Sequence, residues 1–181
     1  MKVTKTTIPE VLLFEPTVYE DNRGYFMETF RESEFIDNGV NLGFVQDNQS
    51  LSKYGTLRGL HYQLRHPQGK LARVISGEIY DVAVDLRKSS SYFGCWVGVK
   101  LSSENRKQLW IPPGFAHGFL VLSEFAELCY KCTDYFYPED DHSLLWMDEE
   151  LSIDWPDVDT TIVLSEKDRQ GKPLSEAPVY E

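Results

Sequence analysis

The sequence predicts an all-β protein: an antiparallel double-sheet sandwich or jelly roll with a few short helices. Short apolar stretches follow one another closely between residues 71 and 136, and glycine or proline residues separate them. Helical periodicity is scarce, and no internal repeat, low-complexity tract or Gly/Ser linker divides the 181 residues. We therefore expect one domain spanning residues 1–181, which is long enough to bury a hydrophobic core.

The expected strands lie mainly in the middle of the chain. Residues 71–75 and 79–86 predict a hairpin, because residues 76–78 between them have the form of a tight glycine turn. In the second arm the even-numbered positions form an apolar face, and Asp81 and Asp85 occupy the other face. Further strands are expected at 95–101, 106–111, 117–122 and 126–136.

Two short helices complete the expected secondary structure. Residues 33–39 predict a helix with Ser33 as its N-cap and Gly39 as its stop. A further turn or two of helix is expected near residues 143–151.

The charge of the chain limits its partners. A net charge of −11 and a pI near 4.8 argue against binding to nucleic acid or to an anionic membrane, because both would repel the protein. A phosphorylated small ligand would need a local cluster of basic side chains. The apolar run at residues 11–14 is too short for a signal peptide or a membrane span, so we expect a cytoplasmic protein.

The cysteines agree with a reducing compartment. Cys95, Cys129 and Cys132 form an odd set, unlike the disulfide framework of a secreted domain. Cys129 and Cys132 have the C-x-x-C spacing of a redox or zinc motif. Because they lie in a strand-like run, they should point to opposite faces. We interpret them as ordinary buried or half-buried thiols.

Two of the four histidines lie in informative contexts. His117 ends a P-x-G-x-x-H segment that is typical of the second motif of cupins, which favours a cupin-type jelly roll. In metal-binding cupins the first motif supplies H-x-H and then a carboxylate, whereas here His61 and Gln63 are followed by Lys70. A lysine ammonium repels a divalent metal, and two histidines make a poor site. We therefore expect no metal and no cofactor.

The remaining polar residues suggest proton transfer. A hydrogen on carbon beside a ketone is removed by a positioned base, and the enolate needs a positive charge or a hydrogen-bond donor. His61 suits the base, Lys70 the enolate, and Tyr130 the acid on the opposite face. The alternatives are a core histidine, a loop charge and a core aromatic. Sequence alone leaves open whether the three residues meet.

Several basic residues sit in tight polar motifs, although for each one the simpler interpretation is a solvated charge. They are Arg23, Arg58, Lys70, Arg73 and Lys167. Strict strand alternation would send Arg58 and His61 to opposite faces, and a bulge at Gly59 would bring them to the same one.

Taken together, the motifs resemble the dTDP-4-dehydrorhamnose 3,5-epimerase family over nearly the whole chain. Any single segment is weak evidence, but seven in the same order and spacing are a strong signal. The segments lie at residues 21–28, 46–50, 57–63, 69–74, 110–119, 130–134 and 164–168.

The resemblance implies a homodimeric cupin-type jelly roll that epimerises dTDP-4-dehydro-6-deoxy-D-glucose to dTDP-4-dehydro-L-rhamnose. It implies that His61 is the base, Tyr130 the acid and Lys70 the group that stabilises the enolate. Asp168 would hydrogen-bond His61 and fix its tautomer, and His117 would line the sugar site.

For the nucleotide and its pyrophosphate, the resemblance implies contacts with Arg23, Glu28, Gln46, Asn48, Arg58 and Lys167, with Phe26 as a stacking surface for thymine. The family commonly has a glutamate where this chain has Asp141, so that contact depends on a shorter side chain. Because residues 23–28 are distant in sequence from the catalytic strands, we expect them to reach the site of the partner subunit.

Three other functions remain open at this stage. A close relative could act at one carbon only, or on another nucleotide sugar. A metal-dependent cupin, such as an oxygenase or isomerase, is a second alternative. A catalytically silent sugar-binding cupin is a third, and the joint presence of a candidate base and acid argues against it.

Overall fold

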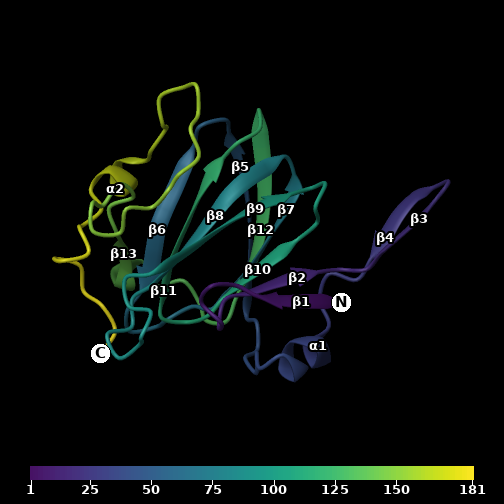
Figure 1. Ribbon diagram of the computed structural model, residues 1–181, viewed down its shortest axis with the longest axis horizontal. Coiled ribbons are helices and arrows are strands. Elements are labelled where there is room, and N and C mark those ends of the chain that lie inside the picture. The colour runs from purple at the N-terminus through teal and green to yellow at the C-terminus, as the bar shows by residue number, and fades with distance from the viewer.

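The computed structural model describes residues 1–181 and consists mainly of two antiparallel sheets packed face to face (Figure 1). The first sheet has the order β1 (Lys2–Lys5), β2 (Leu12–Glu15), β10 (Gln108–Ile111), β7 (Lys70–Ser76), β12 (Phe125–Cys132) and β5 (Gln46–Lys53). The second has the order β13 (Asp141–Ser143), β6 (Leu57–Gln63), β11 (Phe115–Val121), β8 (Glu78–Asp85) and β9 (Trp96–Ser102). The expected all-β jelly roll is confirmed.

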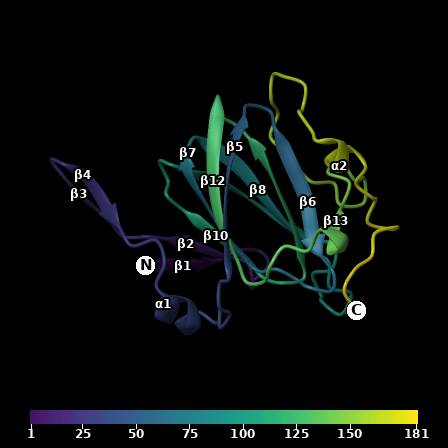
Figure 2. The same ribbon diagram turned by 180° about the vertical axis from the view of Figure 1, so that it is seen from behind.

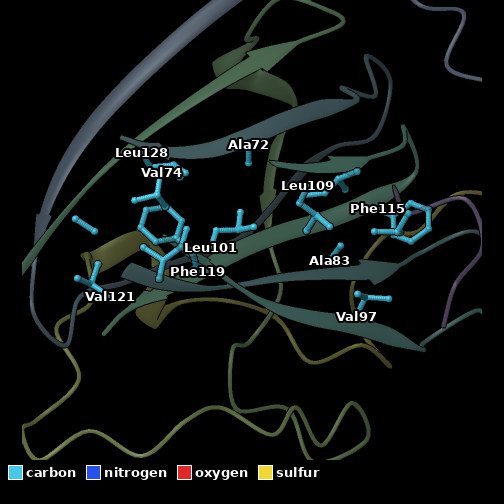
Figure 3. Packing of buried hydrophobic residues seen from close by; sticks show 14 of the residues in the cluster. Ala72, Val74, Ala83, Val97, Leu101, Leu109, Phe115, Phe119, Val121 and Leu128 are labelled. Atoms are coloured by element: carbon cyan, nitrogen blue, oxygen red, sulfur yellow. The ribbon is translucent and has the colours of Figure 1, made fainter. Parts of the chain in front are cut away.

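The main hydrophobic core lies between these two sheets (Figure 3). Strand alternation supplies it: Ala72, Val74 and Leu128 point inward from the six-stranded sheet, and Ala83 and Phe119 point inward from the five-stranded sheet. The same inward faces carry polar residues further along the strands. Core and polar cavity therefore share one interior.

The outer face of the five-stranded sheet is covered by the C-terminal part of the chain. Leu144, Leu151 and Leu174 pack against a buried row from β6, β8 and β11 that includes Val82 and Val84. Isolated bridges join this C-terminal part to the rest of the chain, among them Thr56 with Val163 and Arg87 with Tyr180. Strand β8 is consequently buried on both faces, which explains the apolar even positions noted in its sequence.

The expected hairpin formed by residues 71–75 and 79–86 is wrong. Strand β7 pairs with β10 and β12, whereas β8 pairs with β11 and β9 in the other sheet. The turn at Gly77, with φ of +80°, passes the chain from one sheet to the other. Both strands have neighbours on both sides, so local turn chemistry could not reveal which strands pair.

The helices differ from expectation in part. Helix α1 (Glu32–Asp37) is present, but its N-cap is Arg31, which makes no side-chain cap, so the prediction of Ser33 as N-cap is wrong. The expected helix near 143–151 is also wrong: β13 ends at Ser143, and turns follow. The 3₁₀-helix η1 (Pro138–Asp140) and the helix α2 (Glu166–Arg169) were not anticipated. No helix is long and apolar enough to cross a membrane.

The other predicted strands are present with shifted ends. Strand β12 ends at Cys132 rather than at residue 136, and β10 begins at Gln108 rather than at residue 106. Strand β11 begins at Phe115, and β9 covers the range expected at 95–101 almost completely.

A third sheet, the hairpin of β3 (Val18–Asp21) and β4 (Gly24–Met27), projects away from the sandwich (Figures 1 and 2). Both views place it at the opposite end of the molecule from α2. Its aromatic side chains are exposed, and Phe26 is 70% accessible. A projecting hairpin with exposed aromatic residues has no core of its own to bury them in.

The crossing at Gly77 yields a first prediction. An added Cβ at residue 77 would lie 2.0 Å from the carbonyl oxygen of Phe125, and the positive φ is unfavourable for any other residue. Gly77→Ala should therefore lower the free energy of unfolding by about 1–3 kcal/mol, measured by urea denaturation. Gly43→Ala is the matched control, because an added Cβ there meets nothing within 4 Å. Equal stability of the two variants would contradict the assignment of strain to this crossing.

Candidate active site

Two adjoining cavities open into the interior of the sandwich. One measures about 490 Å³ and the other about 260 Å³, and both are lined by His61, Lys70 and Tyr130. His61 comes from β6 in the five-stranded sheet, whereas Tyr130 and Lys70 come from β12 and β7 in the facing sheet. The structure thus brings together the three residues that the sequence left unconnected, and a ligand between the sheets would have His61 on one side and Tyr130 on the other.

His61 is held by a buried carboxylate. Its Nε2 lies 2.6 Å from Oδ1 of Asp168, and the Asp168 side chain is only 3% exposed. Burial opposes ionisation of this carboxyl, but hydrogen bonds from His61, Ser165 and Gly59 outweigh it and lower the pKa of Asp168 to about 2. In the neutral imidazole an ionised Asp168 accepts the hydrogen of Nε2, so Nδ1 is the ring nitrogen that could act as a base.

Asp168 reaches this position through a local motif. Ser165 and Asp168 form a capping box at the start of α2: Ser165 Oγ accepts from the backbone N–H of Asp168, and Oδ2 of Asp168 accepts from the backbone N–H of Ser165. The hydroxyl of Ser165 also donates to Oδ2 at 2.6 Å. The S-x-x-D spacing could have predicted this helix start from the sequence.

Lys70 is buried and Tyr130 is half-buried, and neither side chain has a hydrogen-bond partner in the chain. Burial raises the pKa of the Tyr130 hydroxyl, so it keeps its proton at neutral pH, and Arg58 opposes this shift. Burial lowers the pKa of the Lys70 ammonium, and the nearby Asp141 and Asp81 oppose that shift. Neither the Tyr130 hydroxyl nor the Lys70 ammonium bonds another group of the chain, and neither of these atoms is completely shielded from solvent. Both therefore open into the cavity.

Arg58 and His61 line the same cavity despite their spacing. Strand β6 has a register shift here: β11 residues His117 and Phe119 pair with His61 and Arg58, so β6 carries one extra residue. The bulge expected at Gly59 is confirmed. An added Cβ at Gly59, whose φ is +113°, would lie 2.5 Å from the Cα of Gly118, so only glycine fits this close approach.

The smaller cavity carries the polar residues of β5 and the rim. Gln46 and Asn48 line it, and the Gln46 side-chain amide donates to Asn48 at 3.1 Å. Asp141 also lines it and forms a short ion pair with Lys167 of α2. The aspartate at this position thus reaches a basic group from the adjacent segment, and Lys167 lies at the rim rather than in the larger cavity.

A family profile described as dTDP-4-dehydrorhamnose 3,5-epimerase matches residues 5–176. The chain belongs to the dTDP-4-dehydrorhamnose 3,5-epimerase family. The enzyme of that name from Methanothermobacter thermautotrophicus is 55% identical over 97% of this chain and 96% of its own. The one from Pseudomonas aeruginosa is 55% identical over 99% of both chains. The dTDP-6-deoxy-D-glucose-3,5-epimerase of Legionella pneumophila, solved in complex with dTDP-4-keto-L-rhamnose, superposes with a TM-score of 0.95 at 49% identity over 98% of this chain and 94% of its own.

Three of the predicted substrate-binding residues do not line the cavities of their own chain. Arg23, Phe26 and Glu28 lie on or beside the projecting hairpin (Figure 2). Arg23 pairs with Asp21 at 2.6 Å, and Glu28 pairs with Arg31 at 2.8 Å. None of these three side chains lines either cavity of its own subunit.

The side chains that could ligate a metal are otherwise engaged. The Gln63 amide donates to the carbonyl oxygens of His66 and Tyr135, and its oxygen accepts from the N–H of Tyr137. Gln63 therefore anchors two loops rather than completing a ligand set. No group of three or more His, Cys, Asp or Glu side chains is arranged to hold a metal ion. The expectation that the enzyme needs none stays a prediction.

Cys129 and Cys132 point to opposite faces of β12, as expected. Cys132 is fully buried and accepts a weak hydrogen bond from the Asn48 amide at 3.5 Å, whereas Cys129 is half-buried. Neither forms a disulfide.

Sequence reasoning missed some residues of the site. Phe136, which is exposed, lines the smaller cavity and lies in the range wrongly predicted as strand. Ser165 holds Asp168, and the capping-box spacing was its signal. Asp81 points inward and bonds His117 at 2.8 Å. Strand alternation in β8 predicted the face on which Asp81 lies, but not its contact with His117.

The low pKa of Asp168 predicts a pH dependence of stability. Its folded pKa of about 2 lies below the ordinary 3.8, so the ionised form stabilises the fold above about pH 4 and this contribution is lost as the pH falls towards 2. Urea midpoints measured from pH 5 to pH 2 should fall less steeply for Asp168→Asn than for the wild type. Glu166→Gln, on an exposed position of the same helix, should keep the wild-type slope. Parallel profiles for all three proteins would exclude the linkage.

Proposed function

We propose that this chain catalyses the 3,5-epimerisation of dTDP-4-dehydro-6-deoxy-D-glucose to dTDP-4-dehydro-L-rhamnose, a step of dTDP-rhamnose biosynthesis. One observation carries the proposal: His61 and Tyr130 line one cavity from opposite sheets, with Lys70 in the same walls. The similar enzymes from Methanothermobacter and Pseudomonas, which carry the 3,5-epimerase name, support it.

The geometry matches what inversion at carbon requires. A proton beside the C4 ketone must leave towards a base on one face of the sugar and return from an acid on the other. Nδ1 of His61 takes the proton, because Asp168 occupies Nε2 at 2.6 Å. The Tyr130 hydroxyl returns a proton, since burial raises its pKa and keeps it protonated until a carbanion forms.

The enolate that forms between the two steps carries negative charge on the former ketone oxygen. Lys70 is the group that meets it, because its ammonium has no ion-pair partner in the chain and opens into the same cavity. A positive charge that already faces the oxygen needs no reorganisation when the enolate appears. The lowered pKa of Lys70 also allows it to share a proton with the enolate.

The nucleotide occupies the outer part of the site in this proposal. Arg58 donates to Ser52 at 2.9 Å through Nε and keeps its terminal nitrogens free for phosphate oxygens. Lys167 stands at the rim as a second cation, and Gln46 and Asn48 supply amides. Arg58 and Lys167 supply the positive charge that a chain of net charge −11 needs for a phosphorylated ligand, and the two amides add neutral hydrogen-bonding groups.

We further propose that the enzyme is a homodimer in which the β3–β4 hairpin reaches the partner's site. Arg23, Phe26 and Glu28 are exposed in one subunit and distant from its own cavity, which is the arrangement that an exchanged arm would have. The outer face of the six-stranded sheet also exposes apolar side chains that a second copy would cover: Leu51, Ile75 and Phe125. Three free cysteines favour a cytoplasmic location.

Proton NMR in deuterated water tests the reaction. With a chelator present, deuterium should enter both C3 and C5 of the substrate. His61→Asn should lower exchange at both carbons by about 10²–10⁴-fold. Tyr130→Phe should abolish the epimerised product while some exchange survives, because removal and return of the proton are separate steps.

His66→Asn is the matched control for these variants, because His66 stacks on Tyr137 outside both cavities. Exchange at one carbon only would identify a single-site epimerase. Activity that the chelator abolishes, with stoichiometric metal in the purified protein, would favour a metal-dependent cupin. Full turnover by Tyr130→Phe would remove Tyr130 from the mechanism.

Subunit complementation tests the exchanged arm. Arg23→Ala and His61→Asn should each inactivate the homodimer. Co-expressed at equal levels, they should regain about a quarter of wild-type activity, since half the dimers are mixed and each has one intact site. If each arm served its own subunit, the mixed dimers would stay inactive. Analytical ultracentrifugation of the same samples gives the oligomeric state.

A further inference from the structure

Asp81 is unusual among the buried carboxylates of this protein. Asp140, Asp148 and Asp168 each accept hydrogen bonds from backbone N–H groups and so hold loops or a helix start in place. Asp85 likewise accepts from a backbone N–H, that of Arg87. Asp81 is fully buried, yet it bonds no backbone group and contacts a single donor, Nε2 of His117, at 2.8 Å.

The second oxygen of Asp81 has no partner. Oδ2 is one of four buried side-chain atoms in the protein without a hydrogen bond. A buried carboxylate with an unpaired oxygen destabilises a fold, so local structure gives no reason for an aspartate at this position. Its one contact is with a histidine that lines the larger cavity. The contact with His117 is therefore the function of Asp81 that the structure supports.

The bond to Asp81 decides which nitrogen of His117 faces the cavity. Nε2 bonds Asp81, whereas Nδ1 makes no hydrogen bond in the chain and is not completely shielded from solvent. Nδ1 therefore opens into the cavity, where the ring centroids of His117 and Tyr130 lie 6.5 Å apart. An ionised Asp81 accepts only, so Nε2 carries the hydrogen and Nδ1 keeps a lone pair.

Two other polar groups share the cavity with this histidine. The Lys70 ammonium opens into the same cavity and interacts with the negative charge of Asp81. Tyr130, the remaining titratable neighbour, holds its proton because burial raises its pKa.

The larger cavity otherwise offers mainly donors. The guanidinium of Arg58, the ammonium of Lys70 and the hydroxyl of Tyr130 all present hydrogens to a ligand. A sugar hydroxyl that enters this space needs an acceptor for its own hydrogen. Nδ1 of His117 is a neutral acceptor in this wall, distinct from His61, whose Nδ1 is the proposed base.

We propose that Asp81 is a positioning residue that holds His117 with Nδ1 unprotonated, so that Nδ1 accepts a hydrogen bond from a hydroxyl group of the bound hexose. The identity of the ligand as a hexose rests on the proposed function. The tautomer of His117 does not, because it follows from contacts within the chain. The two statements can therefore be tested separately.

Nitrogen-15 NMR of the imidazole rings tests the tautomer without any substrate. The chain has four histidines, and loss of one signal in His117→Asn assigns the ring. At neutral pH the wild-type ring should show Nε2 bearing hydrogen and Nδ1 without it. In Asp81→Asn the new amide can donate to Nε2, so hydrogen should appear on Nδ1. A wild-type ring with hydrogen on Nδ1, or no change in Asp81→Asn, would overturn the proposal.

Kinetics and stability separate positioning from a merely structural role. Asp81→Asn should raise KM about tenfold with a smaller effect on kcat, because the hydroxyl contact exists before and during the reaction. Its melting temperature should be unchanged or higher, since the unpaired buried charge is gone. In the His117→Asn background Asp81→Asn should raise KM little further, because the residue that Asp81 positions is absent.

Asp148→Asn is the matched control. Asp148 is also buried, but it holds the N–H groups of Leu151 and Leu174 away from both cavities. This variant should lose stability and keep wild-type KM. An equal rise in KM when Asp81→Asn is introduced into the wild type and into His117→Asn would overturn the acceptor role. Loss of exchange at one carbon only would overturn it as well. If the wild type does not exchange deuterium at all, the proposed substrate is wrong. The tautomer measurement is unaffected by that result, because it uses no substrate.

Discussion

Ionisable groups can lie between two packed sheets only where something offsets their lost hydration, and this constraint organises the interior of the protein. The chain buries Asp168 and Asp81 by giving each an imidazole ring. It buries Lys70 without any partner of its own, at the edge of a cavity that a ligand can fill. The unpaired donors are thus the groups available to a substrate, and the paired carboxylates decide how the two rings present themselves.

The two carboxylate–imidazole pairs are built alike but supported differently. Asp168 is tied to the backbone at Gly59 and Ser165, so the pair with His61 also joins the C-terminal segment to β6. Asp81 sits within a central strand and is tied to nothing but its histidine. The first pair therefore contributes to the fold in addition to its proposed role in catalysis, whereas for the second we propose a role only in the site.

Much of the site could be predicted because its residue types are restricted by chemistry. A histidine, a lysine and a tyrosine in distinctive motifs suggested base, enolate partner and acid, and the spacing of Arg58 and His61 required the bulge that β6 has. Strand pairing could not be predicted in the same way. The run from residue 71 to 86 resembles a hairpin locally, but each arm finds better partners in a different sheet. The burial of both faces of β8 comes from a segment more than fifty residues later, which no local pattern contains.

The sequence alone determined the all-β class, the family and the chemical identity of the groups in the cavity, because strand alternation and motif spacing are local properties of the chain. It could not determine which of those groups meet. The cavity exists because β6 and β12 belong to facing sheets, and His61 is oriented because α2 docks on β6 from the far end of the chain. The same tertiary packing leaves Asp81 with one hydrogen-bond donor, and it leaves the β3–β4 hairpin without a hydrophobic core. Contacts between residues remote in sequence decide these features, since only the folded chain brings such residues within hydrogen-bonding distance.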